Sequence, residues 1–248
     1  QEIAFLYDPA RITAHHLPLG EPAPAVGATG APRFDTSLRA DLDLDGVEEQ
    51  IRFSKPPLEL AITANGHALR LIGVHAKSKT PHGKMSEAAF IRHSIENRRK
   101  QLAECQWLRR RIDSHLEQGD SLIVLGDFND GPGLDEYEKL FGHSGVEIAM
   151  GLTAAPELQL YAPYACMALA QRSGLAPTTA RFWLAPQKRY FEALIDFIMV
   201  SPDLKARRPE WRIWHPFNDP AVMATPELRD AILTASDHFP VTIDLSLY

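Results

Sequence analysis

The chain has 248 residues, of which 45% are hydrophobic, and its formal net charge is −6 at pH 7. This length can bury one sizeable core, and because no Gly/Ser-rich linker divides the chain we expect a single domain over residues 1–248. The excess of acidic residues argues against a surface that binds nucleic acid over a broad area, although it is compatible with a local cationic groove. The sequence contains no run of 18 apolar residues, so we expect no membrane-spanning segment.

The N-terminal segment is strand-like. Residues 3–7 and 11–13 flank Asp8-Pro9, and this pattern predicts a hairpin. The chain begins at Gln1 inside the pattern, without an initiator Met and without the charged and apolar regions of a signal peptide. We therefore expect that the natural protein is longer, and the sequence leaves its localisation open.

Two motifs that follow are similar to metal sites. His15 and His16 are adjacent at the edge of a Pro- and Gly-rich loop over residues 18–32, but with no Cys or third His nearby an exposed pair is favoured over a metal site. Residues 41–46 begin like an EF-hand loop. The twelfth position is Arg52 rather than the required Glu, so we predict a hairpin that turns within this motif.

The strongest hairpin signal in the chain is Asn65-Gly66. Apolar runs over residues 58–64 and 68–75 flank this dipeptide, which is typical of a two-residue turn between antiparallel strands. The second strand places His75 at its end, and Lys77 follows at a period of two. We expect both side chains to point to the same side.

A long amphipathic helix is predicted from Ser86 to a point near Gly119. Its apolar face consists of Ile91, Ile95, Leu102, Cys105, Leu108, Ile112 and Leu116. We expect Cys105, like Cys166 elsewhere, to be a buried small residue rather than a ligand. Seven basic residues also crowd the helix, namely Arg92, Arg98, Arg99, Lys100, Arg109, Arg110 and Arg111. Because acidic residues alternate with them, a solvated, ion-paired face is favoured over a phosphate-binding ridge.

The next segment combines a buried strand with a polar loop. Residues 121–125 form an apolar, β-branched run that ends at Gly126, and Asp127, Asn129 and Asp130 follow. Carboxylate and amide oxygens two positions apart can converge on a hard cation such as Mg²⁺ or Mn²⁺. An ordinary Asx turn is the alternative for this motif when it is taken alone.

The C-terminal third contains an acid within an apolar run. Residues 178–184 and 190–200 predict a hairpin whose second strand carries Asp196. A buried carboxylate is costly unless it is paired. We expect His238 to be its partner.

The other predicted elements in this part of the chain are shorter. A short helix is expected over residues 134–141, and residues 152–177 form a connection with little periodicity. A strand is expected over residues 211–214. A helix over residues 226–233, with Pro at its first position, and a strand over residues 241–247 complete the chain.

Four segments, taken in order, resemble a single family pattern. They are Val74-His75-Ala76-Lys77-Ser78, Gly126-Asp127-Phe128-Asn129-Asp130, Leu194-Ile195-Asp196-Phe197-Ile198-Met199-Val200-Ser201 and Ser236-Asp237-His238-Phe239-Pro240-Val241. In order and spacing they resemble the endonuclease/exonuclease/phosphatase superfamily of metal-dependent phosphoesterases over residues 50–248. The resemblance implies an α+β fold, a four-layer α/β/β/α sandwich of two mainly antiparallel sheets, with the first strands missing here.

The resemblance also implies a site for Mg²⁺ or Mn²⁺. Its expected ligands are Asp127, Asn129 and Asp237. Asp127 would in addition hold or deprotonate the attacking water, and Asn129 would donate a hydrogen bond to that water or to a phosphate oxygen. For Asp237, a simple turn before a histidine is the alternative interpretation.

The remaining catalytic roles fall to two histidines and one acid. The resemblance implies that His238, with Asp196 fixing its tautomer, acts on the phosphate as a base or as a charged donor. His75 would approach from the opposite side, stabilise the transition state and, together with Lys77 and Asn129, bind the substrate. A satisfied structural histidine at a strand end is the alternative for His75.

The chain departs from the family pattern upstream. An Asn at the end of the first strand and a Glu that is the principal metal ligand have no counterpart. Glu2 is the nearest candidate, but the spacing disfavours it because Glu2 begins a strand-like run instead of ending one. This departure puts the metal affinity of the chain in question.

Three functions are compatible with these residues. The leading hypothesis is a metal-dependent hydrolase of phosphodiesters in nucleic acid, DNA or RNA. The second is a phosphatase or phosphodiesterase for lipid head groups or small phosphoesters, which the acidic charge favours. The third is a non-catalytic scaffold that has kept the sandwich and lost the metal site. The sequence does not predict an oligomeric state.

Overall fold

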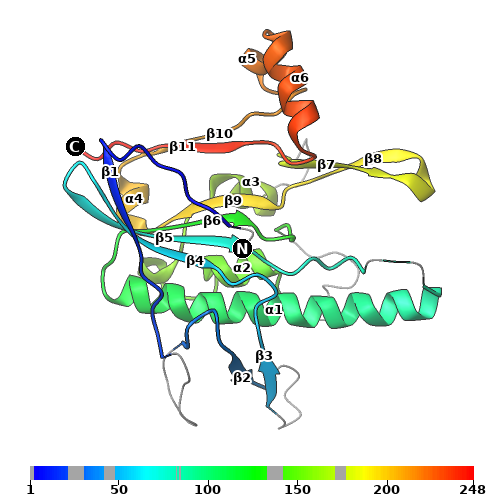
Figure 1. Cartoon of the computed structure of the whole chain (residues 1–248), viewed down its shortest axis with the longest axis horizontal. Helices are drawn as coiled ribbons and strands as arrows, with labels where there is room; N and C mark the ends of the chain where they lie inside the picture. Colours follow the sequence, from blue (N-terminus) through cyan, green and yellow to red (C-terminus); the bar gives the residue numbers. More distant parts are fainter. Residues whose placement is uncertain are drawn as a thin grey trace.

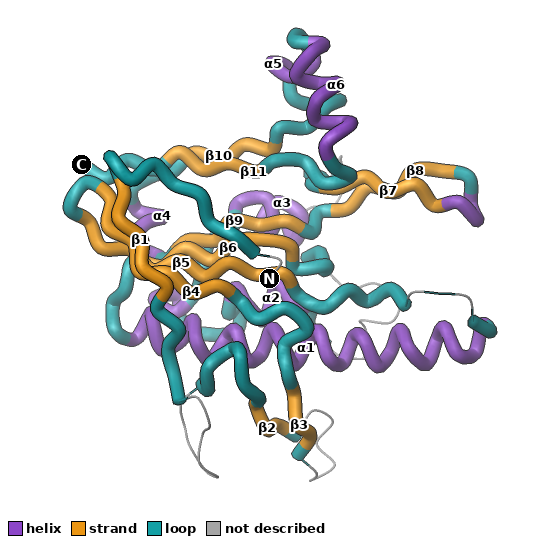
Figure 2. The backbone as a smooth tube through the Cα atoms, in the orientation of Figure 1, coloured by secondary structure: helices purple, strands orange, loops and turns teal. Residues whose placement is uncertain are grey.

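The structure is a computed structural model of the chain, and it describes residues 3–21, 31–41, 48–81, 83, 85–132, 142–170 and 177–248. The described residues form a five-stranded sheet with the long helix α1 along one face and the strand pair β10–β11 along the other (Figure 1). Figure 2 shows the same layers by secondary structure. The strands follow the order β1 (Ile12–His16), β4 (Leu58–Ala64), β5 (His67–His75), β6 (Leu122–Asp127) and β9 (Asp196–Val200).

Strands β5 and β6 are parallel, whereas the other neighbours in this sheet are antiparallel. The predicted hairpin at Asn65-Gly66 joins β4 to β5, and both turn residues have positive φ. A parallel pair requires a crossover. Helix α1 (Glu87–Glu117) supplies it and begins after Ser86, close to the predicted start. The side chain of Ser86 caps the helix by accepting the N–H of Ala89.

Two apolar clusters hold the layers together. One lies between the sheet and α1, and its buried members include Phe34, Phe53, Ile72, Trp107 and Val124. The other lies on the opposite face, where buried residues of β4 and β5 pack against Trp211 and Ile243 of the β10–β11 pair. Both faces of the sheet are therefore covered.

The remaining elements are short, and several stand away from the sheet. They are β2 (Leu38–Ala40), β3 (Glu49–Ile51), α2 (Gly145–Met150), η2 (Pro156–Leu158), α3 (Pro163–Ala170), β7 (Ala180–Leu184), η3 (Ala185–Gln187), β8 (Arg189–Ala193), α4 (Pro202–Ala206), β10 (Glu210–Ile213), α5 (Pro220–Met223), α6 (Pro226–Ala235) and β11 (Val241–Asp244). Helices α5 and α6 rise above the body, and the β7–β8 hairpin projects to one side (Figure 1).

Two strand predictions were wrong. Residues 3–7 lie outside any strand, since Ile3 and Phe5 pack on the apolar face of the sheet while β1 pairs with β4. The predicted strand over residues 190–200 is two strands. The break occurs because the N–H groups of Ile195 and Asp196 turn to the hydroxyl of Thr179, at 3.1 and 3.0 Å.

Three predictions concern residues that the structure does not describe. The helix over residues 134–141, the turn within residues 41–46 and Glu2 fall outside the described residues, although β2 and β3 pair on either side of the turn. The connection over residues 152–177 contains η2 and α3. Cys105 is buried and Cys166 half-buried, and both are free. No helix in the described ranges has the length and apolarity to cross a membrane.

The expected fold class is confirmed in its coarser features. The chain mixes helices with a five-stranded sheet that is mainly antiparallel. Besides this sheet, the described residues contain three two-stranded pairs, β2–β3, β7–β8 and β10–β11, and the four-layer sandwich stays a prediction.

Candidate active site

Three of the expected site residues form one row across the sheet. His75 on β5 is the register partner of Asp127 on β6, and Asp127 is the register partner of Asp196 on β9. Directly opposed residues of neighbouring strands share one face of a sheet. The sequence places these residues up to 121 positions apart, and the strand pairing alone brings them to one edge.

The fourth member, His238, comes from the loop before β11. An isolated bridge between His238 and Ala180 and the hydrogen bond from Phe239 N–H to Thr179 O (2.7 Å) hold this loop against β7. Its Nδ1 lies 3.0 and 3.1 Å from the carboxylate oxygens of Asp196, so the predicted pairing is confirmed. This hydrogen bond is the main cause that raises the pKa of His238.

Asp127, Asp196 and His238 could together hold a cation. Each offers one ligand atom, and these atoms all lie within 4.8 Å of one another. Burial raises the pKa of Asp127, and the nearby charge of Asp196 raises it further, against the Asn129 N–H that lowers it. A divalent cation would offset the repulsion between these carboxylates. Their hard oxygen donors fit Mg²⁺ or Mn²⁺.

The turn after β6 fixes Asn129 beside Asp127. The backbone N–H of Asn129 donates to Asp127 Oδ1 (2.7 Å), and its Nδ2 donates to Asp127 Oδ2 (3.1 Å) and to Ala76 O (3.0 Å). Asn129 has a φ of 50°, a left-handed conformation that Asn tolerates better than most residues. The Asx turn and the site are therefore the same structure, and the two sequence interpretations do not exclude each other.

The sequence profile of the Endonuclease/Exonuclease/phosphatase family matches residues 7–238. The chain belongs to this family. The family consists of phosphoester hydrolases that typically depend on a metal ion. Curated protein sequences gave no match to the chain.

Distant likenesses to solved structures of the family accompany this match. A truncated TDP2 from Caenorhabditis elegans is 12% identical, with a TM-score of 0.42 over 85% of this chain and 65% of that chain. An AP endonuclease from Archaeoglobus fulgidus is 16% identical, with a TM-score of 0.41 over 76% of this chain and 65% of that chain. The catalytic domain of human Nocturnin is 14% identical, with a TM-score of 0.38 over 95% of this chain and 73% of that chain. The chain spans 65% and 49% of two C. elegans TDP2 chains.

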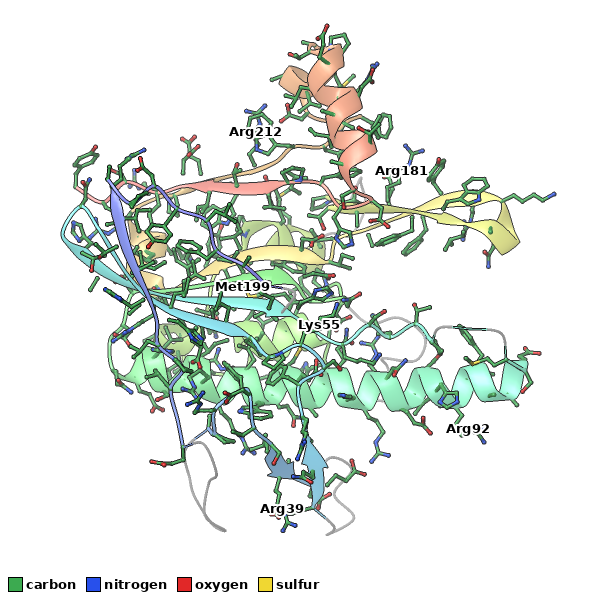
Figure 3. All side chains as sticks on the ribbon, viewed as in Figure 1. Arg39, Lys55, Arg92, Arg181, Met199 and Arg212 are labelled. Carbon is green, nitrogen blue, oxygen red and sulfur yellow. The ribbon has the colours of Figure 1, made fainter. Side chains whose placement is uncertain are left out.

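One basic residue of the site was not among the predicted catalytic residues. Lys55 lies in the segment between β3 and β4, and its Nζ is 2.8 Å from His75 Nε2. His75 Nε2 is in turn 3.5 Å from Asp127 Oδ2. Figure 3 labels Lys55 at this end of the sheet. Nothing in the local sequence around Lys55 indicates a histidine neighbour.

Three buried polar residues of α1 form hydrogen bonds to the loops that carry the candidate site. Glu104 accepts the N–H groups of Ser54 and Lys77, each at 2.8 Å. Gln101 Nε2 donates to the carbonyl oxygens of Phe128 and Asn129, each at 3.0 Å. Side chains on one face of α1 thus form hydrogen bonds to three segments: the one that carries Lys55, the one that follows β5 and the loop that follows Asp127.

The third of these residues, Arg98, shows that the predicted solvated face of basic residues on α1 is partly wrong. Arg98 is 2% exposed and its Nη1 lies 3.3 Å from both carboxylate oxygens of Asp130, which is fully buried. Arg111 is 3% exposed and lies 3.3 Å from Glu59. These two arginines of the basic cluster are therefore not on a solvated face. They pair with acids from other elements, which the sequence pattern of the helix does not show.

Two of the predicted site residues, Asp237 and Lys77, are not part of the cluster of Asp127, Asp196 and His238. Asp237 is exposed and does not belong to the Asp127, Asp196 and His238 cluster, and its carbonyl accepts the Arg181 N–H at 2.8 Å. Lys77 is half-buried and anchored through its backbone. The roles of both residues stay predictions.

A groove of about 940 Å³ opens beside the site. Asn129 lies in its wall together with Lys79, Phe182, Arg189 and Phe191. The ring of Phe182 also makes an edge contact with the His238 ring, at 5.5 Å between centroids. The groove therefore leads directly to the catalytic candidates, and its wall combines aromatic rings with positive charge.

Proposed function

We propose that this protein hydrolyses phosphodiester bonds with the help of Mg²⁺ or Mn²⁺, and that its substrate is a nucleic acid. The observation that carries the proposal is the convergence of Asp127, Asp196 and His238 at one edge of the sheet. Membership of a phosphoesterase family supports the class of reaction.

The chemistry follows from what each side chain can do. Because Nδ1 of His238 is bonded to Asp196, its Nε2 is left to meet the phosphate or the attacking water. The raised pKa of His238 favours the charged ring, which donates a hydrogen bond to a phosphate oxygen. Asp127, whose pKa is raised by burial, is suited to accept the proton of the attacking water.

The metal would be held at the carboxylate of Asp127. The family resemblance implies Asn129 and Asp237 as further ligands, although Asp237 is exposed and lies outside the Asp127, Asp196 and His238 cluster. When bound, it would neutralise charge on the phosphate oxygens. Lys55 and His75 would stabilise the negative charge that develops on the other side of the phosphate. In this proposal, positive and proton-accepting groups would surround one phosphate.

Nucleic acid is the favoured substrate because of the adjoining groove. Phe182 and Phe191 can contact a base or sugar, and Arg189 can contact a neighbouring phosphate, whereas Lys79 of the same wall pairs with Asp130 Oδ1 at 2.7 Å. A small phosphoester would leave this groove of about 940 Å³ unused.

The test is the release of acid-soluble nucleotides from DNA and RNA in the presence of Mg²⁺ or Mn²⁺. We expect EDTA to abolish the release and His238→Ala to reduce it at least about 100-fold. His15→Ala, which changes an exposed histidine on β1, is the matched control and should keep the wild-type rate. Hydrolysis confined to monoesters or lipid head groups would overturn the substrate assignment, and metal-independent or absent hydrolysis would overturn the reaction.

A further inference from the structure

The β7–β8 hairpin separates two grooves. Phe182 and Phe191 are register partners on one of its faces, and they line the groove that reaches Asn129. Trp183 and Tyr190 are register partners on the other face, and they line a second groove of about 670 Å³. Successive residues of a strand point to opposite faces, so each groove contains one of the two aromatic pairs.

The second groove is also continuous with the catalytic loop. Ser236 and Asp237, which directly precede His238, belong to its lining, as does Leu233 of α6. His238, which bridges to Ala180 at the start of β7, thus lies at the base of the hairpin with a groove on each side. A substrate that occupies both grooves must extend from the phosphate in two directions.

The second groove presents aromatic rings and one ordered cation. Trp183 and Tyr190 are 54% and 55% exposed, and their rings are in edge contact at 5.0 Å between centroids. The guanidinium of Arg181 lies 4.0 Å from the centroid of Tyr190 and 4.5 Å from that of Phe217. Figure 3 labels Arg181 on β7 beside α6. Such stacking fixes the charge of Arg181 next to an accessible aromatic surface.

We propose that this second groove binds an unpaired nucleobase of a single-stranded nucleic acid, on the side of the scissile phosphate opposite to the Asn129 groove. The proposal rests on the proposed function and deepens it. The exposed rings of Trp183 and Tyr190 stack on the base, and Arg181 faces the adjoining phosphate. The cleaved bond is then an internal diester with a base on each side.

Three features favour a single strand over other occupants. Bases within a duplex are stacked on each other and cannot reach rings that line a groove, whereas unpaired bases can. The hairpin carries three basic residues, Arg181, Lys188 and Arg189, and one acid, Glu192, whose Oε1 lies 3.5 Å from Arg181 Nε, so the hairpin keeps a net positive charge in a chain whose net charge is −6. A membrane surface would also meet exposed aromatics and cations, but a bilayer would not enter a groove of about 670 Å³ whose lining includes Ser236 and Asp237.

Binding is measured by fluorescence with the full chain in EDTA, so that hydrolysis plays no part. The probes are a single-stranded oligothymidylate of about twelve nucleotides, an abasic oligomer with the same phosphates, a duplex of the same length and vesicles that contain phosphatidylserine. We expect the oligothymidylate to bind at least about tenfold more tightly than the abasic oligomer and the duplex. We also expect it to quench the fluorescence of Trp183, and Trp183→Phe identifies this contribution.

The chain offers matched neighbours for the variants. Tyr190→Ala should weaken the binding of the oligothymidylate about tenfold and leave the binding of the abasic oligomer unchanged. Phe191→Ala, one residue away on the other face, should leave the quenching of Trp183 in place. The proposal is overturned if the abasic oligomer or the duplex binds equally well, if vesicles bind in preference to the oligomers, or if no probe binds. Metal-dependent hydrolysis of bis(p-nitrophenyl) phosphate is assayed separately, so a failure of the base site is distinguished from a failure of the proposed reaction.

Discussion

The carboxylate of Glu104 in α1 accepts the backbone N–H of Lys77 at 2.8 Å. Its second oxygen accepts the N–H of Ser54 at the same distance, and the side chain is fully buried. One acid thus fixes the loop after His75 and the loop that carries Lys55. The geometry of the active site depends in this way on a residue that does not line it.

Replacement of Glu104 by Gln tests this positioning role. The amide would place its NH₂ group opposite one of the two N–H donors, and a buried unsatisfied donor costs about 1–3 kcal/mol. We expect the free energy of unfolding to fall by that amount in chemical denaturation and kcat to fall about tenfold, with a smaller change in KM. Glu117→Gln, on the exposed end of the same helix, should change stability by less than about 0.5 kcal/mol. Equal kinetics for wild type and Glu104→Gln would show that the loops are positioned by other contacts.

The pairing of Asp196 with His238 predicts a change in titration. Because the hydrogen bond to Asp196 is the main cause of the raised pKa of His238, Asp196→Asn should lower that pKa in the metal-free protein. The ring then loses its proton at a lower pH than in the wild type. The imidazole proton shift in NMR, followed across a pH titration, measures the effect. Asp237→Asn should lower the pKa less, since the charge of Asp237 is the weakest of the contributions; a larger effect from Asp237 would contradict the pairing.

Gly126 has a specific steric role between β5 and β6. Its φ is 134°, and a Cβ at this position would lie 2.0 Å from the carbonyl oxygen of Val74. We expect Gly126→Ala to reduce the free energy of unfolding by more than about 3 kcal/mol, because strain and overlap with the backbone of β5 combine. Gly66→Ala is the control, since Gly66 also has a positive φ but has no atom within 4 Å of the added Cβ. Similar losses for the two variants would show that the close approach to Val74 has no effect of its own.

The buried pair of Glu59 and Arg111 predicts a dependence of stability on pH. Burial raises the pKa of Glu59 to about 7, against the opposing effect of Arg111 at 3.3 Å. The unfolded chain has the ordinary, lower pKa, so the stabilising contribution of protonated Glu59 is fully present below that value. This contribution is lost as the pH rises through about 7, so the free energy of unfolding should fall by up to about 3 kcal/mol.

Chemical denaturation of wild type and Glu59→Gln at about pH 5 and about pH 8 tests this dependence. The amide does not titrate, so the wild type should lose stability relative to the variant between the two pH values. Arg111 keeps hydrogen bonds to the carbonyl oxygens of Leu19, Ala31 and Pro32 in either case. A difference between the two proteins that stays constant with pH would rule out the raised pKa.

The sequence predicted those parts of the site that depend on local patterns. The apolar strand that reaches Gly126, the Asn65-Gly66 turn and the start of the helix at Ser86 each have a signal within a few residues, and the structure contains all three. Strand β6 continues through Gly126, however, so Asp127 is its last residue and does not lie in the loop as expected. The pairing of Asp196 with His238 was also predictable, because an acid in an apolar run requires a partner.

Other features depend on contacts between distant elements and could not be predicted. Arg98 and Arg111 carry the same local pattern as the exposed arginines of α1, and only the positions of Asp130 and Glu59 on other elements decide that they are buried. The break before β9 depends in the same way on the hydroxyl of Thr179. Lys55 joins the site because β4 and β5 bring its segment beside His75.

A double-mutant cycle in the metal-dependent hydrolysis of bis(p-nitrophenyl) phosphate tests most directly whether Asp196 and His238 act as one catalytic unit. We expect Asp196→Asn and His238→Ala each to lower kcat/KM by about 100-fold or more, and the double variant to be no slower than His238→Ala alone. Single variants that retain the wild-type rate, or losses that multiply in the double variant, would contradict a shared catalytic role of Asp196 and His238.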